Sequence, residues 1–160
     1  MFGFGKKKVA LAAPFSGTVV PVEEVPDPMF SGKMLGDGFA VKPSDDAHEL
    51  TVTAPADGKL LKVFKTGHAF AMVTSEGLEL LVHIGLETVE MKGEGFTVLA
   101  ENGQEVTAGT PVVKVDLDAV HAAGRDPITI VVLTKKGQVS EVSVHSGASS
   151  SKPAAEVTLA

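Results

Sequence analysis

His68 and His83 are the residues whose types and spacing best suit chemistry, because they stand at the two ends of one predicted hairpin. Neutral imidazole is already a nucleophile near pH 7 and needs no base to activate it. One ring nitrogen can attack phosphorus while the other donates a hydrogen bond that fixes the tautomer. A second imidazole can donate to the phosphoryl oxygens, and the Thr66 hydroxyl stands close enough in sequence to help. The pair indicates phosphoryl transfer if the two rings meet.

Two other interpretations of these histidines stay open from the residues alone. Each histidine could be a satisfied side chain on a half-buried strand with no chemical role. A zinc site would need three or four ligands, and Glu79 is the nearest candidate for a third. The remaining histidines stand in loops or at strand ends, where we expect ordinary surface residues: His48, His121 and His145.

The register of the predicted hairpin decides whether the two imidazoles share a face. With a two-residue turn at Ser75-Glu76, His68 faces His83 directly, and directly opposite side chains lie on one side of the sheet. With a three-residue turn in which Gly77 is a left-handed bulge residue, His68 faces Ile84 instead. The two rings would then point to opposite faces. The residues alone do not choose between these registers.

The elements that must position the histidines have β character throughout. Runs rich in Val, Thr, Ile and Phe are separated by Gly, Pro, Asp and Asn, and no segment carries a long 3.6-residue apolar period. The pattern predicts an all-β, antiparallel β-sandwich with at most one or two short helical turns, the best of them at Leu117–Ala123. The predicted strands are Lys8–Ala12, Gly17–Pro21, Phe39–Pro43, Leu50–Thr53, Gly58–Val63, Ala69–Thr74, Leu78–Ile84, Thr97–Leu99, Pro111–Val115, Ile128–Leu133, Val139–Val144 and an edge strand at Ala155–Leu159.

A short phrase repeats within the chain. Ala13-Pro14-x-x-Gly17 and Ala54-Pro55-x-x-Gly58 are each followed by an apolar run, and a related phrase begins at Gly103. Repeated phrases of this kind predict quasi-repeated hairpin units and a sandwich built from similar halves.

The composition limits the classes of function. A chain of 160 residues suits a single domain, 1–160, with flexible segments expected at 1–8 and 146–153. The net charge of -6 argues against nucleic-acid binding, which favours basic surfaces. There is no Cys, which suits a reducing compartment, and no apolar run approaches the ~20 residues that span a bilayer. The N-terminal sequence has no apolar stretch typical of a secretory signal.

Several phrases together carry a family resemblance. They are APFSG at 13–17, VPDPMF at 25–30, GDGFAVKP at 36–43, APADG at 54–58, TGHAF at 66–70, LLVHIGLETVEMKGEGF at 80–96 and GQEV at 103–106. The chain resembles the glucose-type enzyme IIA component of the bacterial phosphoenolpyruvate-dependent sugar phosphotransferase system from about residue 11 to about residue 145. The phrase at 80–96 is the most specific of the set.

The resemblance implies a phosphohistidine carrier of the transferase class, cytoplasmic and monomeric. It would accept a phosphoryl group from HPr and donate it to the IIB domain of a sugar permease. His83 matches the family's phosphorylated histidine, His68 its second active-site histidine, and Thr66 a threonine that hydrogen-bonds within the site. The family's register brings the histidines together, which favours the two-residue turn. The implied partner-docking residues are Phe30, Met34, Leu35, Phe64, Phe70 and Leu81.

Burial offers another interpretation of some docking residues. Core packing explains Phe64 and Leu81 as well as docking does, whereas Phe30, between Pro-rich and Gly-rich loops, is expected at the surface. Leu81 stands where the family often has Phe, and Glu87 where it often has Asp.

The resemblance also bears on cofactors and further partners. It implies no cofactor beyond the phosphoryl group, no intrinsic metal site, and membrane contact only through the permease. In some members of the family, the two histidines and a partner's carboxylate form a zinc site, and some members regulate other proteins. The sugar stays open among glucose, N-acetylglucosamine and β-glucosides.

Two other classes of protein share some features with this sequence. Val89-Glu90-Met91-Lys92 is superficially similar to a biotinyl or lipoyl carrier hairpin, but those domains are shorter and place a Met on each side of the Lys, whereas Gly93 follows here. A regulatory binder that has lost phosphorylation is disfavoured because both His68 and His83 are present.

Overall fold

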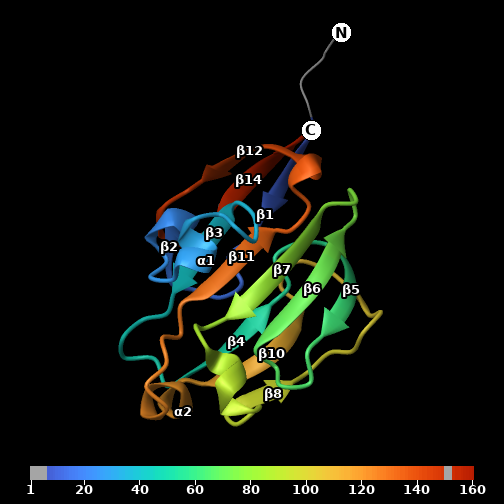
Figure 1. Cartoon of the computed structure of the whole chain (residues 1–160). Helices are drawn as coiled ribbons and strands as arrows, with labels where there is room; N and C mark the ends of the chain where they lie inside the picture. The colour runs from blue at the N-terminus through green and yellow to red at the C-terminus, as the bar shows by residue number, and fades with distance from the viewer. Residues whose placement is uncertain (1–6, 150–152) are drawn as a thin grey trace, which may run out of the picture.

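A computed structural model describes residues 7–149 and 153–160, which fold mainly into antiparallel strands (Figure 1). The strands are β1 (Lys8–Leu11), β2 (Thr18–Pro21), β3 (Gly38–Lys42), β4 (Glu49–Thr53), β5 (Gly58–Val63), β6 (Ala69–Thr74), β7 (Glu79–Ile84), β8 (Phe96–Val98), β9 (Glu105–Val106), β10 (Pro111–Asp116), β11 (Thr129–Leu133), β12 (Val139–Val144), β13 (Gly147–Ala148) and β14 (Ala155–Leu159). Short helices α1 (Pro28–Ser31) and α2 (Leu117–Ala122) and the 3₁₀ turns η1 (Val22–Glu24), η2 (Thr88–Met91) and η3 (Lys136–Gln138) complete the described elements.

The strands form a two-layered sandwich. One layer is an eight-stranded sheet in the order β13-β2-β3-β11-β7-β6-β5-β9, and the other consists of two three-stranded sheets, β1-β14-β12 and β4-β10-β8. Figure 1 shows β1-β14-β12 at the upper end and β4-β10-β8 behind β6 and β7. Leu11, Val113 and Val82, one from each sheet, are buried in the same apolar cluster, so the layers share one core. The predicted antiparallel β-sandwich is confirmed.

A second, smaller cluster lies on the outer face of the eight-stranded sheet. Val20, Ala40 and Ile130 stand side by side on β2, β3 and β11, and Phe30 of α1 packs against them. The segment that contains η1 and α1 therefore covers part of the face that would otherwise meet solvent, in front of β3 in Figure 1.

Helix α1 was not predicted, although the sequence carries a signal for it. Asp27 is the N-cap, its side chain accepts a hydrogen bond from Met29 N at 2.9 Å, and Pro28 occupies the first helical position. Asp followed by Pro is a typical start for a helix, because the carboxylate satisfies a free N–H and Pro has none to satisfy. The helix is too short to show an apolar period.

The repeated Ala-Pro phrases interlock about an approximate two-fold relation. Ala12 N donates to the Pro55 carbonyl at 2.8 Å, and Thr53 N donates to the Pro14 carbonyl at 2.8 Å. Ala12, directly before the first phrase, corresponds in position to Thr53, directly before the second, and Pro14 corresponds to Pro55. The two hydrogen bonds therefore join equivalent pairs of residues in opposite directions. The predicted repeat is therefore a structural one, and its two copies hold each other.

The glycine of each phrase has the same steric role. A Cβ at Gly17 would collide with the Lys42 carbonyl of β3, and a Cβ at Gly58 would collide with the Val73 carbonyl of β6. Both positions require glycine because the neighbouring strand approaches too closely for any side chain.

The β6–β7 hairpin has a three-residue turn, so the expected two-residue turn is wrong. Thr74 N donates to the Leu78 carbonyl at 2.8 Å, Gly77 N donates to the Thr74 carbonyl at 2.9 Å, and Gly77 has a φ of 92°. Gly77 takes the left-handed bulge conformation that such a turn favours. The resulting register pairs Ala69 with His83.

The expectations for the chain ends are corrected in part. Ala155–Leu159 is a strand, but it lies between β1 and β12 and not at an edge. Lys8 pairs with Thr158, as expected for the first residue of the predicted strand Lys8–Ala12, and Gly147–Ala148 pairs with β2. Residues 1–6 and 150–152, expected to be flexible, lie outside the described residues.

Candidate active site

The rings of His68 and His83 lie against each other on the outer face of the eight-stranded sheet. Their centroids are 5.5 Å apart and their planes meet at 80°. His68 is 8% exposed, and His83, near the end of β7, is half-buried. The structure therefore brings together the two histidines that the sequence singled out.

The rings meet although the register does not pair the two residues. β6 begins at Ala69, the partner of His83, and His68 lies at a bend immediately before that strand. Ile84 N donates to the His68 carbonyl at 2.7 Å, so the backbone pairing continues through the bend. Side-chain alternation holds only in an extended strand, so the bend allows the His68 ring to reach His83. The expectation that this register separates the rings is wrong for that reason.

The backbone fixes the tautomer of His83. His83 Nδ1 lies 2.8 Å from the Gly85 carbonyl oxygen, which can only accept, so Nδ1 carries the proton and donates. The Nε2 lone pair is then free for attack on an electrophile. Gly85 has a φ of 78°, and a Cβ there would lie 2.5 Å from Thr88 Cγ2. The sequence analysis missed Gly85, whose signal is a glycine directly after the strand that carries a histidine.

Thr66 lies where the sequence analysis placed it, next to His68. Its Oγ1 is 2.5 Å from His68 Nδ1, and either atom can be the donor, depending on the tautomer. Between them, Gly67 has a φ of 71°, and a Cβ at that position would lie 2.8 Å from Phe96 Cβ. The tight turn that this glycine permits folds the threonine hydroxyl back onto the imidazole.

Both imidazoles favour the neutral form. Burial lowers the pKa of His68, and the neighbouring His83 lowers it further. Burial also lowers the pKa of His83, against which the hydrogen bond to Gly85 and the charge of Asp27 act weakly in the opposite direction. A neutral ring keeps the lone pair that a nucleophile needs, so the site is prepared for attack near neutral pH.

Two phenylalanines stand beside the histidine pair. The Phe30 ring centroid is 5.2 Å from that of His83, and the Phe64 centroid is 5.2 Å from that of His68. Phe30 is only 5% exposed, so the expectation of a surface docking residue is wrong for it: its ring forms a wall of the site and anchors α1 in the outer cluster.

Phe70 also departs from the docking prediction. It pairs with Val82 on the inner face of the sheet and is fully buried in the main core, because the strand alternation that exposes Ala71 turns Phe70 inward. The other four docking candidates keep exposed surface, with Met34 at 62% and Leu35, Phe64 and Leu81 partly exposed. For these four, docking stays a prediction.

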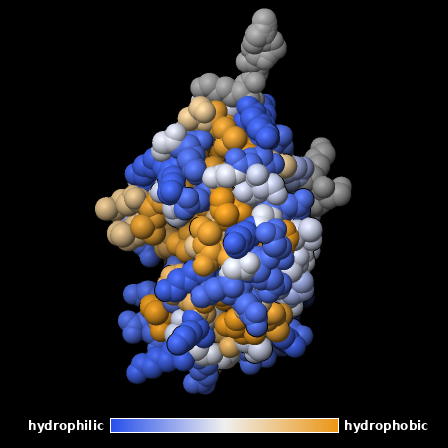
Figure 2. Space-filling model, turned by 90° about the vertical axis from the view of Figure 1, so that its right-hand side faces the viewer, coloured by the Kyte–Doolittle hydropathy of each residue, from blue (hydrophilic) through white to orange (hydrophobic). Residues whose placement is uncertain are grey.

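Two exposed apolar residues, one on α1 and one on η2, were missed by sequence reasoning. Met29 of α1 is 46% exposed and Val89 of η2 is 49% exposed. Figure 2 views the molecule from the β5 side and shows hydrophobic residues protruding at the left edge, the side on which α1 lies. Met29 directly precedes Phe30 in the chain, and that adjacency in sequence was the available signal for it.

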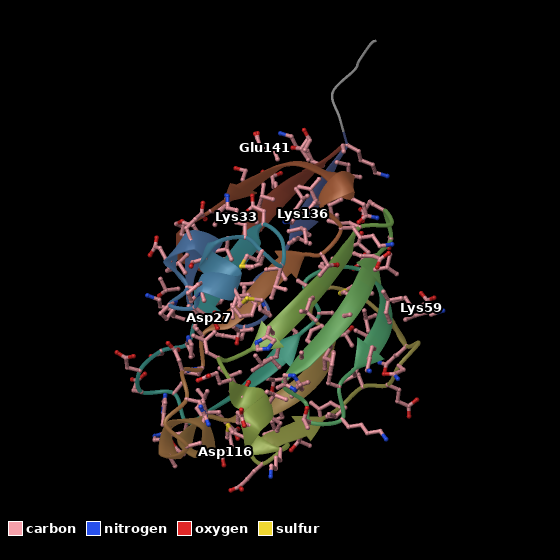
Figure 3. All side chains as sticks on the ribbon, viewed as in Figure 1. Asp27, Lys33, Lys59, Asp116, Lys136 and Glu141 are labelled. Atoms are coloured by element: carbon pink, nitrogen blue, oxygen red, sulfur yellow. The ribbon has the colours of Figure 1, made fainter. Side chains whose placement is uncertain are left out.

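The acidic residues near His83 come from two elements. Asp27, labelled at the start of α1 in Figure 3, is close enough to His83 to affect its pKa. Glu87 has a left-handed backbone with a φ of 56°, and its carboxylate pairs with Arg125 at 3.3 Å. Of these two carboxylates, only that of Asp27 acts on the His83 ring, because the charge of Glu87 is matched by Arg125.

The other histidines lie outside the site, as expected. His48, His121 and His145 are exposed. His48 Nδ1 lies 2.9 Å from an Asp118 carboxylate oxygen. Glu79, the nearest candidate in sequence for a third zinc ligand, pairs with Lys135 at 2.7 Å. Within residues 7–149 and 153–160, no group of three or more His, Asp or Glu side chains could hold a metal ion.

Comparison with known proteins agrees with this site and fold. Residues 9–139 match the family model of the phosphoenolpyruvate-dependent sugar phosphotransferase system, EIIA 1. The chain is 37% identical over 159 residues to the glucose-specific EIIA component of this system in Bacillus cereus, covering 98% of this chain and 94% of that protein. It is 38% identical over 148 residues to the glucose-specific EIIA component of Staphylococcus aureus, covering 91% and 87%.

A larger relative and a solved structure complete the comparison. The chain is 46% identical over 129 residues to the glucose-specific EIICBA component of Streptococcus pneumoniae. The matched region covers 81% of this chain and 17% of that larger protein. The structure of glucose permease IIA from Mycoplasma capricolum superposes with a TM-score of 0.83 at 36% identity, covering 98% of this chain and 99% of that one.

A β-sandwich with a paired-histidine site thus defines a IIA-type phosphoryl carrier. The chain belongs to the EIIA 1 family of the phosphoenolpyruvate-dependent sugar phosphotransferase system, and it is a phosphoryl carrier in sugar transport. None of the described helices is long and apolar enough to cross a membrane.

Proposed function

We propose that this protein accepts a phosphoryl group from phospho-HPr on Nε2 of His83 and passes it to the IIB domain of a glucose-type permease. The observation that carries the proposal is the hydrogen bond of 2.8 Å from His83 Nδ1 to the Gly85 carbonyl, which leaves Nε2 as the free nucleophile. The names of the relatives from Bacillus cereus and Staphylococcus aureus support glucose as the sugar.

The transfer step follows from this geometry. The Nε2 lone pair of His83 forms a bond to phosphorus while the bond from phosphorus to the donor's imidazole nitrogen breaks, and that electron pair returns to the donor ring. The His83 ring gains positive charge as the bond forms, and the Gly85 carbonyl stabilises it through the Nδ1 proton. In onward transfer His83 is the donor. A nucleophile of the IIB domain forms a bond to phosphorus while the bond from phosphorus to His83 Nε2 breaks, and that electron pair returns to the His83 ring.

His68 and Thr66 act together in this proposal. If the Thr66 hydroxyl donates to His68 Nδ1, the proton of His68 resides on Nε2 and can be donated to the phosphoryl oxygens. The ring spacing of 5.5 Å supports that role, because it leaves room for a phosphoryl group bound to His83 to contact His68. Charge on the transferring phosphoryl oxygens is then met by a prearranged donor.

The proposal extends to cofactors, partners and location. The phosphoryl group comes from the partner, so no resident cofactor takes part, and we propose a monomer in the cytoplasm that meets the membrane only through its permease. Zinc requires four ligands in a closed site, and His68 and His83 supply two nitrogens, so a zinc site would need a partner's carboxylate. Partners regulated by the protein would dock on the same exposed or partly exposed apolar side chains, those of Met34, Leu35, Phe64 and Leu81.

The direct test is phosphorylation in vitro with phosphoenolpyruvate, enzyme I and HPr, followed by intact mass. We expect a gain of one phosphoryl group that is lost in acid and retained in base, and no gain in His83→Ala. Phosphorylation of that variant to the wild-type level would remove His83 as the nucleophile. Absence of any gain while HPr itself becomes phosphorylated would remove the proposed function.

A further inference from the structure

A β-bulge in β5 turns a lysine toward the histidine side of the sheet. Leu60 pairs with Met72 and Lys62 pairs with Ala71, so Leu61 is an extra residue without a partner on β6. Leu61 and Lys62 are consecutive and both exposed, which a regular strand over a buried core does not allow. Bulges next to active sites commonly re-aim a side chain, and the side chain re-aimed here is Lys62.

Small residues separate Lys62 from His83. Ala71, the partner of Lys62 on β6, is itself paired with Leu81 of β7. In the adjacent row, Phe64 N donates to the Ala69 carbonyl at 3.1 Å, and Ala69 is paired with His83. The side chains between Lys62 and His83 on the outer face are therefore small, with Ala71 beside Lys62 and Ala69 beside His83.

The Lys62 ammonium lies at the rim of the site. Its Nζ is 4.8 Å from the centroid of the Phe64 ring, whose centroid is in turn 5.2 Å from that of His68. Among the described residues, no carboxylate forms an ion pair with Lys62. The cation therefore rests on the face of an aromatic ring, a weak contact at an exposed position.

We propose that Lys62 binds the phosphoryl group carried by His83, leaving the Phe64 ring when the phosphoryl group arrives. The inference rests on the proposed function and adds one residue to its site. Lys62 stands two strands from His83 and two residues out of line with it, which is about 12 Å at the usual strand spacing and rise. A flexible four-carbon stem reaches about 6 Å across the alanines, and a phosphoryl group on Nε2 projects into the remaining space.

Charge decides which contact the ammonium makes. The unphosphorylated rings of His68 and His83 are neutral and give it no electrostatic reason to leave Phe64. A phosphoryl group brings about two negative charges and three acceptor oxygens, which attract an ammonium more strongly than an exposed ring does. Movement of Lys62 also uncovers the face of Phe64, so the phosphorylated and unphosphorylated proteins present different apolar surfaces to their partners.

The test is the equilibrium of phosphoryl exchange with HPr, measured by intact mass on the full chain. Wild type is measured first, and its phosphorylation on His83 establishes the proposed function independently of Lys62. We expect Lys62→Met, which keeps the apolar stem, to shift the equilibrium toward the unphosphorylated protein by about three- to tenfold, as the loss of one partly exposed charge-assisted contact would. Lys62→Arg should retain most of the wild-type equilibrium.

Two matched controls isolate the position of the charge. Lys59→Met removes a lysine from the same strand, where Figure 3 shows Lys59 pointing outward from the side of the molecule. Lys65→Met removes an exposed lysine from the turn that precedes His68. Both should leave the equilibrium within about twofold of wild type, as surface charges screened by solvent do.

Salt separates a charge effect from a structural one. Raising the ionic strength should shift the wild-type equilibrium more than that of Lys62→Met, because the contact that salt screens is absent from the variant. The inference is overturned if wild type is phosphorylated on His83 and Lys62→Met shows the same equilibrium and salt dependence as Lys59→Met. It is also overturned if Lys65→Met shifts the equilibrium as far as Lys62→Met.

Discussion

His83 pairs with Ala69 across the β6–β7 hairpin, yet its ring lies against that of His68, with centroids 5.5 Å apart. The small Ala69 side chain and the bend at His68 together make this contact, because one leaves space beside His83 and the other places a second imidazole in that space. The two histidines should therefore have distinct and separable roles.

Replacing each histidine in turn should affect two different steps, acceptance of the phosphoryl group and its onward transfer. We expect His83→Ala to lose phosphorylation entirely, and His68→Ala to accept a phosphoryl group but to pass it on about 100-fold more slowly, as loss of a charge-stabilising donor predicts. Single-turnover transfer to a IIB domain would measure the second effect. His121→Ala, which removes an exposed histidine from α2, is the matched control and should behave as wild type. Equal transfer rates for His68→Ala and this control would contradict the prediction.

Thr66 should act through the tautomer of His68. Thr66→Val keeps the shape and removes the hydroxyl that lies 2.5 Å from His68 Nδ1, so onward transfer should slow about tenfold, the effect of one lost hydrogen bond. Thr66→Ser should restore it. The ¹⁵N shifts of His68 report the tautomer directly and should show the Nε2–H form in wild type and a mixture in Thr66→Val. An unchanged tautomer in the variant would contradict this role.

Gly85 should be required for the stability of the fold around the site. Gly85→Ala places a Cβ 2.5 Å from Thr88 Cγ2 and 2.9 Å from the Asp126 carbonyl, at a φ of 78°. We expect the free energy of unfolding in urea to fall by about 2–3 kcal/mol. Gly103→Ala has a similar φ of 82° but no atom within 4 Å of the added Cβ, so its loss should be only about 1 kcal/mol. Equal losses of unfolding free energy in the two variants would show that backbone strain alone, without the steric clash, explains the effect of Gly85→Ala.

The protonation of the histidines should divide them into two groups. Burial lowers the pKa of His68 and of His83 below 6.5, whereas the hydrogen bond to Asp118 raises the pKa of the exposed His48. An NMR titration should show His68 and His83 gaining their protons at a lower pH than His48. A titration of His83 at or above that of His48 would contradict the assignment.

The same shifts set the sign of the pH dependence of folding. In the unfolded chain these histidines bind a proton near pH 6.5, where the folded His68 and His83 do not. Their neutral forms therefore stabilise the folded state fully above that pH, and stability falls as the pH drops through it toward the lower folded pKa values. His83→Ala should show a smaller loss of stability between pH 7 and pH 5 than wild type, measured by urea unfolding.

Met34 should contribute to partner docking without supporting the fold. It is 62% exposed, so Met34→Asp should weaken HPr binding about tenfold, the loss from one apolar contact at an interface, and leave the unfolding free energy nearly unchanged. Leu99→Asp is the matched control, since Leu99 is 47% exposed and directly follows β8, which Figure 1 shows at the lower end of the molecule, away from α1. Calorimetric titration with HPr measures both, and equal affinities would exclude Met34 from the interface.

The sequence predicted most strands because alternation and turn residues are local signals. Gly58–Val63, Ala69–Thr74 and Val139–Val144 have the predicted bounds, and α2 differs from the predicted helical turn by one residue, Ala123. Local signals also identify His68, His83 and Thr66 as one group. Their contact confirms the grouping, while their chemical roles stay predictions until they are tested.

What local signals missed depends on backbone geometry at single residues. The turn length depends on whether Gly77 adopts a left-handed conformation. The alternation of apolar and polar residues along each strand is the same for a two-residue and a three-residue turn, so it does not reveal which one forms. The bend that redirects His68 and the inward side of Phe70 follow from that pairing. The burial of Phe30 depends on α1 folding back over strands distant in sequence, a contact that no local pattern encodes.

The groups proposed for chemistry all lie between Thr66 and Gly85, with Lys62 just before them, whereas the methionine-bearing surface comes from α1 and the residues around it. The docking candidates Met34 and Leu35 thus lie in a different stretch of the chain from the histidines, and the two stretches touch where Phe30 meets His83. The docking candidates Phe64 and Leu81 lie in the same stretch as the histidines. If Met34 docks partners as predicted, substitutions around α1 would change partner affinity while the histidine pair keeps its geometry. A protein arranged in this way can diversify its partners by small steps, without passing through inactive intermediates.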